Sequence, residues 1–204
     1  MATAVLDPEL YALATRQRPL TVDEYHRMAE AGILSEDDRV ELLDGRLIAM
    51  TPIGPLHLHC VNRLTELFAR RLFAAEAPAA RLSVQNPIRL SDTSEPEPDV
   101  VLLTPEAPQD RTPVPADLVL VVEVAVTSGD YDRTVKAPRY AAAGVPVYWV
   151  VDLEQEVVDV RREPDGDTYA ERIRYRRGDD LPLPAALHVD PIPVSDVFEE
   201  TGKD

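Results

Sequence analysis

The sequence predicts a mixed α/β fold of the α+β kind, with a central sheet flanked by two main helices and extended by an antiparallel hairpin. Three features predict it. Residues 117–126 (DLVLVVEVAV) form an almost continuous apolar run, which is typical of a buried central strand. Apolar residues between positions 57 and 76 recur at helical spacing. Two strand-like runs, 156–162 and 168–176, are separated by the short turn sequence EPDG.

The first elements are expected after an N-terminal extension over residues 1–20. Thr21 and Glu24 have the spacing of a capping box, which predicts a short helix to about Ala31. Asp44 and Gly45 separate the apolar runs RVELL and RLIAM, and this pattern predicts a tight β-hairpin.

The remaining elements follow in alternation. The long helix over residues 57–76 carries an apolar stripe made of Val61, Leu64, Leu67, Phe68 and Leu72. Strands are expected in RLSVQNPIRL (81–90), PDVVLL (98–103) and DLVLVVEVAV (117–126). A second helix over Tyr131–Ala143, closed by Gly144, precedes a buried strand in PVYWVVD (146–152).

The 204 residues suit one domain, which we expect to span residues 21–198 and to leave a tail over 199–204. A single cysteine, Cys60, excludes a disulfide framework and a cysteine-rich zinc site. Because no apolar run has the length of a signal peptide or a membrane span, we expect a soluble, cytoplasmic protein.

The charge balance is strongly acidic. Lysine and arginine number 21, aspartate and glutamate number 37, and the formal net charge is −16. This argues against a protein that holds nucleic acid by charge alone, because phosphate binding normally relies on a basic patch. A metal ion could still bring such a protein to a phosphate.

Two acidic residues interrupt or open apolar strands. Glu123 lies within the LVLVVEV run, where a carboxylate is costly unless it is ion-paired, hydrogen-bonded or bound to metal. Asp99 opens the preceding apolar strand directly after a proline. Acids on neighbouring strands can converge on one cation, and oxygen ligands favour Mg²⁺ or Mn²⁺. The alternative is a solvated aspartate at a strand end and a glutamate in an internal salt bridge.

Lysine is rare in this chain, which has Lys136 and Lys203 beside nineteen arginines. Lys136 is therefore the one lysine in the body of the predicted domain, and it lies in the helix that follows Glu123. A lysine ammonium can orient an attacking water or balance charge on a phosphate. The alternative is an exposed helical ion pair, since Asp132 and Lys136 are four residues apart.

Four segments, taken together, resemble the Uma family of restriction endonucleases, a branch of the PD-(D/E)XK nuclease superfamily. They are ELLDG (41–45), TPIGPLHLHCVNRL (51–64), PEPDV (96–100) and VVEVAVTSGDYDRTVKAPRYAAAGVPVYWVVDL (121–153). The resemblance covers most of the chain, from about Thr21 to Phe198. It implies a PD-(D/E)XK nuclease-like sheet and hydrolysis of DNA phosphodiester bonds with Mg²⁺ or Mn²⁺.

The resemblance also implies roles for individual residues. Asp99 matches the metal-binding aspartate of the superfamily. Glu123 matches the acid of its E-x-K motif, and the Val124 carbonyl is a further metal ligand. The lysine of that motif is expected at position 125, which is Ala125 here, and Lys136 in the next helix occupies the matching place.

Two more residues match the family pattern. Glu41 matches the acid of its first motif and would take part in catalysis as a ligand of a second metal. His57 matches a histidine that opens the following helix and could take or give a proton, although neighbouring His59 offers an alternative register. Pro138 closely follows Lys136, so Lys136 is expected at a kink or at the true start of its helix.

DNA contacts would have to come from local arginines, which lie along the long helix (Arg63, Arg70 and Arg71) and in the late hairpin (Arg161, Arg162, Arg172, Arg174, Arg176 and Arg177). In RIRYRR, strand alternation places Arg172, Arg174 and Arg176 on one face, which could follow a phosphate backbone. The alternative is a solvated strand face balanced by nearby acidic residues.

Two functions of different classes stay open. The first is a metal-dependent DNA endonuclease, which would most simply make a double-strand cut as a symmetric homodimer. The second is a catalytically silent nuclease-fold protein that serves interaction or regulation. The net charge favours the second. So does Val126, because the resemblance implies a polar residue at this position in many members of the family. A small-molecule hydrolase lacks support, because no G-x-S-x-G motif occurs and Cys60 has no evident partner.

Overall fold

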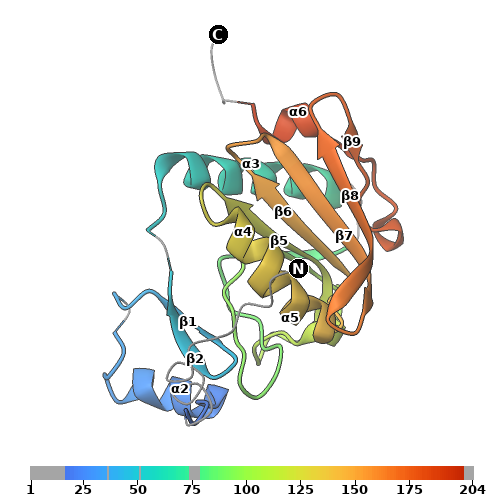
Figure 1. Ribbon diagram of the computed structural model, residues 1–204. Coiled ribbons are helices and arrows are strands. Elements are labelled where there is room, and N and C mark those ends of the chain that lie inside the picture. The colour runs from blue at the N-terminus through green and yellow to red at the C-terminus, as the bar shows by residue number, and fades with distance from the viewer. Residues whose placement is uncertain (1–16, 36, 51, 74–78, 200–204) are drawn as a thin grey trace, which may run out of the picture. The chain divides into compact units, whose positions relative to one another are not determined.

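The computed structural model describes residues 17–35, 37–50, 52–73 and 79–199 (Figure 1). They divide into two compact units: residues up to 50 with 92–94, and residues 51–91 with those from 95 onward. The predicted domain limits at 21 and 198 stay a prediction. Most of the expected extension and tail lie outside the described residues. Within the described part, no helix is long and apolar enough to cross a lipid bilayer.

The smaller unit contains helix α2 (Val22–Glu30) and a hairpin of β1 (Val40–Leu43) and β2 (Arg46–Ala49). α2 begins with a capping box, because Thr21 Oγ1 accepts from the Glu24 amide at 3.2 Å and the Glu24 carboxylate accepts from the Thr21 amide at 3.0 Å. The hairpin turns at Asp44 and Gly45, whose φ angles of 51° and 71° are those that a tight two-residue turn requires.

The larger unit is built on a six-stranded mixed sheet in the order β3-β4-β5-β6-β7-β8. The strands are β3 (Arg81–Val84), β4 (Val100–Leu103), β5 (Leu118–Ala125), β6 (Val147–Asp152), β7 (Val157–Asp165) and β8 (Thr168–Arg176). β5 and β6 run parallel, and all other neighbours are antiparallel. The predicted α+β fold, a mixed central sheet extended by the β7–β8 hairpin, is confirmed.

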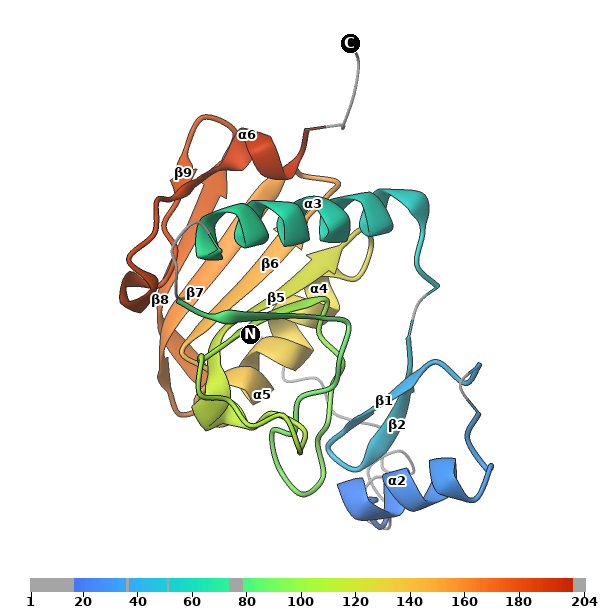
Figure 2. The same cartoon turned by 180° about the vertical axis from the view of Figure 1, so that it is seen from behind.

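Helices cover both faces of this sheet. α3 (Pro55–Leu72) crosses one face (Figure 2), and its Phe68 ring lies 5.9 Å from the ring of Trp149 on β6. The other face carries α4 (Gly129–Tyr131), the π turn Asp132–Lys136 and α5 (Ala137–Ala142) (Figure 1). Because both faces are covered, the central strand β5 reads as an almost continuous apolar run.

Short elements complete the larger unit. β9 (Asp180–Leu181) pairs with β10 (Ile192–Pro193), and α6 (Val194–Val197) follows directly. Two short 3₁₀ turns span Pro115–Asp117 and Ala185–Leu187. α6 contributes Val194 and Val197 to the apolar core on the α3 side of the sheet.

Some predicted boundaries are wrong, for local reasons. The strand expected over residues 81–90 ends at Val84, because Gln85 has a φ of 50° and leaves extended geometry. EPDG is not a separate turn, because β7 continues to Asp165 and Pro164 pairs with Tyr169. α3 ends at Leu72, and the predicted helix end at residue 76 lies outside the described residues.

The helical segment after β5 begins at Gly129 and widens into a π turn. In a regular α-helix the amide of residue 138 would donate to the Thr134 carbonyl, but Pro138 has no amide hydrogen and its ring clashes with that carbonyl. The turn closes instead with the Ala137 amide on the Asp132 carbonyl. Lys136, with a φ of −72°, is the last residue of the π turn and the N-cap of α5, which agrees with its predicted place at a kink or helix start.

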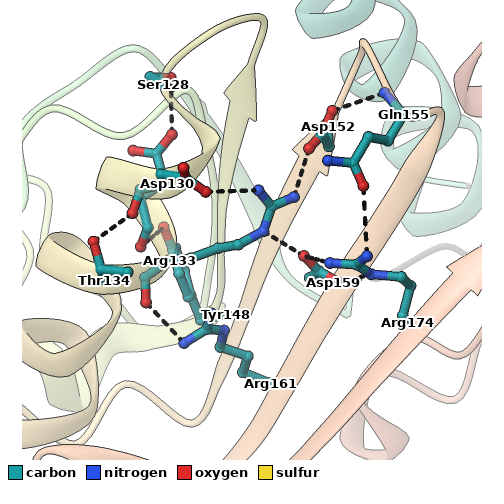
Figure 3. Close-up of polar contacts among 11 residues, drawn as sticks. Ser128, Asp130, Arg133, Thr134, Tyr148, Asp152, Gln155, Asp159, Arg161 and Arg174 are labelled. Carbon is teal, nitrogen blue, oxygen red and sulfur yellow. Dashed lines mark hydrogen bonds and ion pairs between the residues drawn. The ribbon is translucent and has the colours of Figure 1, made fainter. Parts of the chain in front are cut away.

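Arg133 ties the π turn to the sheet (Figure 3). Its Nη2 donates to Asp152 of β6 at 2.7 Å, and its Nε donates to Asp159 of β7 at 2.5 Å. Asp159 also accepts from Arg174 of β8, at 2.6 and 3.0 Å. These four residues are the Arg133 network. A Cβ at Gly129 would lie 2.6 Å from Arg133 Nη1, so a glycine leaves room for the guanidinium.

The Arg133 network predicts an acid-sensitive contribution to stability. Burial alone would raise the pKa of Asp159, but hydrogen bonds from Arg174 and Arg133 hold it below its ordinary value. The charged carboxylate therefore stabilises the fold above the unfolded pKa of about 3.9, and this contribution is lost as pH falls through the lower folded pKa. We expect Asp159→Asn to reduce the free energy of unfolding at neutral pH by about 2 kcal/mol.

Urea unfolding near neutral pH and at a pH below the lowered folded pKa measures this contribution. The difference between wild type and Asp159→Asn should shrink toward zero in acid. A loss of equal size at both pH values would show that Asp159 acts through packing and not through its charge.

Candidate active site

The candidate site centres on the Glu123 carboxylate, which β5 directs toward the face covered by α5. The residue is 5% exposed, and its Oε1 accepts from Lys136 Nζ at 3.0 Å and from the Tyr140 hydroxyl at 2.8 Å. These donors share one side of the helical segment. The ion pair and the hydrogen bond offset the cost of burying the carboxylate charge.

Lys136 lies in the interior, with 8% of its surface exposed. Asp132 is buried as well, and its carboxylate accepts from the Ser128 hydroxyl at 2.9 Å. The alternative of an exposed helical ion pair between Asp132 and Lys136 is therefore wrong. Lys136 binds the acid of the central strand.

Asp99 lies one residue before β4, at the end of the ladder with β5. The ladder pairs Val100 with Val122, and its continuation by one residue sets Asp99 opposite Glu123. Asp99 Oδ2 accepts from the Val124 amide at 2.8 Å. The Asp99 carboxylate thus accepts the hydrogen bond that a backbone carbonyl would accept if the β4–β5 ladder continued, and it does so directly beside Glu123.

The Val124 carbonyl faces the same edge as Asp99. On the β6 side of the strand, the Ala125 carbonyl accepts from the Leu153 amide at 2.9 Å. Because backbone groups of successive residues point to opposite sides of a strand, those of Val124 point toward Asp99. Two carboxylates and one carbonyl oxygen are therefore grouped at this end of β4 and β5.

These oxygen donors fit Mg²⁺ in their chemistry. Mg²⁺ usually keeps several waters and is held by one or two carboxylates, with substrate phosphates as further ligands. Within the residues that the structure describes, no group of three or more His, Cys, Asp or Glu side chains could hold a metal ion. Asp99, Glu123 and the Val124 carbonyl would leave the remaining ligand positions of such a cation to water and substrate.

Glu41 belongs to the smaller unit, where it lies on β1 opposite Ile48 of β2. Its predicted role as a ligand of a second metal stays a prediction.

His57, in the first turn of α3, contacts Asp99. Its Nε2 lies 3.1 Å from the Asp99 carboxylate. Its Nδ1 is buried and has no hydrogen-bond partner among the described residues. His59 Nε2 lies instead 3.1 Å from the Glu199 carbonyl. Of the two histidines, the structure brings His57 to the candidate site.

Tyr140 is a site residue that the sequence pattern does not single out. It is fully buried, packs against Tyr148 with ring centroids 4.8 Å apart, and donates to Glu123. Its spacing of four residues from Lys136 is the available signal, because that spacing places two side chains on one helix face. An aromatic residue at that position is equally typical of an ordinary core.

Cys60 is buried in α3 and is unsuited to nucleophilic catalysis. Burial raises the pKa of its thiol to about 12, and the negative charge of Asp99 acts in the same direction. Since the thiolate is the nucleophile, Cys60 stays unreactive near neutral pH.

The mixed sheet has acids at the adjoining ends of its antiparallel strands β4 and β5, and a lysine reaches Glu123 from the covering helical segment. The family model Uma2, described as "Putative restriction endonuclease", matches residues 22–194, and the chain belongs to this family. A crystal structure of "a putative nuclease belonging to DUF820" from Anabaena variabilis ATCC 29413 shares the fold. It is 15% identical with a TM-score of 0.68, and the match covers 88% of this chain and 98% of that one. No curated protein matches the chain in sequence.

The Glu123–Lys136 pair predicts strong energetic coupling. Lys136→Met leaves a buried carboxylate without its ammonium partner, and we expect a loss of about 3–5 kcal/mol in the free energy of unfolding. The double variant Glu123→Gln/Lys136→Met should lose less than the sum of the two single changes, by about 1–3 kcal/mol. Urea unfolding of the four proteins gives this coupling energy.

The exposed pair Glu66–Arg70 on α3 is the matched control, since its side chains are 41% and 66% exposed. The same cycle there should give a coupling below about 0.5 kcal/mol. Equal coupling energies for the two pairs would contradict the importance of burial.

The buried thiol predicts slow labelling. At neutral pH, a thiol-specific disulfide reagent should react with native Cys60 far more slowly than with the urea-unfolded chain, because both burial and the raised pKa suppress the thiolate. Absorbance of the thiolate that the reagent releases on reaction measures both rates. Rapid labelling of the native protein would contradict the buried, protonated thiol.

Proposed function

We propose that the chain is a Mg²⁺-dependent DNA endonuclease whose active site is formed by Asp99, Glu123 and Lys136. One observation carries the proposal: Asp99 binds the Val124 amide directly beside Glu123, whose carboxylate binds Lys136. This grouping of carboxylates with one buried ammonium suits hydrolysis of a phosphodiester. Membership of a family described as restriction endonucleases supports it.

Asp99, Glu123 and the Val124 carbonyl would hold the cation. Bound Mg²⁺ supplies charge that stabilises the phosphoryl oxygens and lowers the pKa of a bound water. Lys136 offsets the negative charge of Glu123, which would otherwise repel an approaching phosphate. Tyr140 holds Glu123 Oε1 in place by its hydrogen bond.

His57 would act on protons beside this group. Its bond to Asp99 through Nε2 fixes the ring orientation and assigns the neutral proton to Nε2. Nε2 is the ring nitrogen that faces the candidate site, and beside Asp99 it would give a proton to a leaving oxygen or take one from an attacking water. An aspartate that orients a histidine in this way also holds one tautomer.

Three further parts of the proposal follow from what a DNA endonuclease of this family would require. Glu41 would bind a second metal directly or through water. Two copies of the chain, related by symmetry, would make a double-strand cut. The protein would work in the cytoplasm, with Mn²⁺ able to replace Mg²⁺.

Cleavage of plasmid and single-stranded DNA with Mg²⁺, Mn²⁺ or EDTA tests the proposal. We expect cutting that requires the metal and falls at least about 100-fold in Asp99→Asn, Glu123→Gln and Lys136→Met, because each removes charge from the reacting centre. Lys136→Arg keeps the charge and covers the case in which Lys136→Met fails to fold. Glu156→Gln, at an exposed ion pair with Arg177, is the control and should cut like wild type.

The same experiment separates the second candidate, a catalytically silent interaction protein, which the net charge of −16 favours. Absence of cutting on every DNA substrate, together with no calorimetric binding of Mg²⁺ or Mn²⁺, would overturn the endonuclease proposal. Cutting that survives all three substitutions would point to a contaminating nuclease.

A further inference from the structure

A cationic hollow lies on the α5 face of the sheet, over β7 and β8. Its volume is about 210 Å³, and its lining includes Arg133, Asp159, Arg161, Arg172 and Arg174. We call it the arginine hollow. The β7–β8 register pairs Asp159 with Arg174 and Arg161 with Arg172, so these side chains share one face. Arg133 reaches the hollow from the π turn (Figure 3).

The carboxylates at the hollow are already engaged. Asp159 accepts from both Arg133 and Arg174, and Asp152 accepts from Arg133. Arg161 donates to the Arg133 carbonyl at 3.1 Å, and Arg172 donates to the Thr168 hydroxyl at 2.5 Å. Among the described residues, Arg161 and Arg172 therefore have neutral acceptors and no carboxylate partner.

The two arginines without a carboxylate lie side by side. Arg161 and Arg172 are cross-strand partners, and like charges in that position repel each other. Burial lowers the pKa of Arg161, and the positive charges of Arg172 and Arg133 act in the same direction, against the opposing effects of Tyr148 and Asp159. An anion in the hollow would relieve this repulsion and would meet guanidinium groups whose planar geometry matches phosphate.

The hollow is close to the candidate active site within the same unit. Arg133 precedes Lys136 by three residues on the π turn, so one turn of the segment serves both places. Tyr148 of β6 donates from its hydroxyl to the Asp132 carbonyl at 3.2 Å, and its pKa, raised mainly by burial, is raised further by the charge of Glu123. The Glu123–Lys136 pair faces the same side of the sheet as the hollow.

We propose that the arginine hollow binds a phosphate of the DNA backbone, at a distance from the phosphodiester that is cut. This inference rests on the proposed function and specifies how an acidic protein engages its substrate. The net charge of −16 repels DNA as a whole, so attachment depends on a local cluster whose charge is not cancelled. Contacts of this kind position the nucleic acid without reading its sequence.

The salt dependence of DNA binding tests the inference. Fluorescence anisotropy of a labelled duplex in EDTA, which prevents metal-dependent cutting, gives the affinity over a range of KCl concentrations. Arg172→Gln should reduce the slope of log affinity against log salt by about 0.9, because one phosphate contact is lost. The weakening should be similar for duplexes of unrelated sequence.

Arg70→Gln is the matched control, since it removes the same charge from an exposed arginine on α3, which covers the opposite face of the sheet. Its salt slope should equal that of wild type. Arg161→Lys keeps the charge of a half-buried residue but loses the planar fork, and it should weaken binding without reducing the slope. Thermal unfolding of each variant confirms that the fold is retained.

The outcomes separate this inference from the proposed function. A slope for Arg172→Gln equal to that of wild type would overturn the inference, even where the protein cuts DNA. A reduced slope in a protein that shows no metal-dependent cutting would support the hollow and reject the nuclease. Saturable thermal stabilisation by inorganic phosphate that Arg172→Gln abolishes, with an unchanged DNA slope, would overturn the backbone site in favour of a small phosphate ligand.

Discussion

A charged carboxylate in the middle of the central strand determines how one whole face of the sheet is built. β5 is covered on both faces, so Glu123 cannot be solvated by water without opening the core. Its charge is kept there because the covering helical segment supplies an ammonium and a hydroxyl to the same oxygen. The segment therefore needs a fixed rotation about its axis, since Lys136 and Tyr140 must reach one point together.

The π turn provides that rotation, and the sheet satisfies the polar groups that the turn leaves open. The Ala137 amide is used by the Asp132 carbonyl, and Pro138 has no amide to offer. The Arg133 carbonyl is left without either of these backbone donors, and Arg161 Nη1 donates to it from β7. One proline thus explains both the wide turn and the inward aim of an arginine two strands away from β5.

The fold followed from local patterns, because burial on two faces makes β5 apolar and a capping box or an Asp-Gly turn leaves a direct mark on the sequence. Asp99, Glu123 and Lys136 were also recognisable, since each breaks the composition around it. Tyr140 was not, because a tyrosine at that spacing looks like ordinary core. The bond from Asp99 to the Val124 amide depends on where the β4 ladder stops. Likewise, Arg174 but not Arg172 is neutralised because Asp159 lies opposite Arg174 in the β7–β8 register.

The close passage of Arg133 over Gly129 has a consequence for how the sequence can change. A Cβ at position 129 would lie 2.6 Å from Arg133 Nη1, so the guanidinium would have to shift from the position in which it binds β6 and β7. Homologues should therefore exchange the two positions together or keep both. A survey of the family would then show a covarying pair, four residues apart, that records a steric fit and carries no information about catalysis.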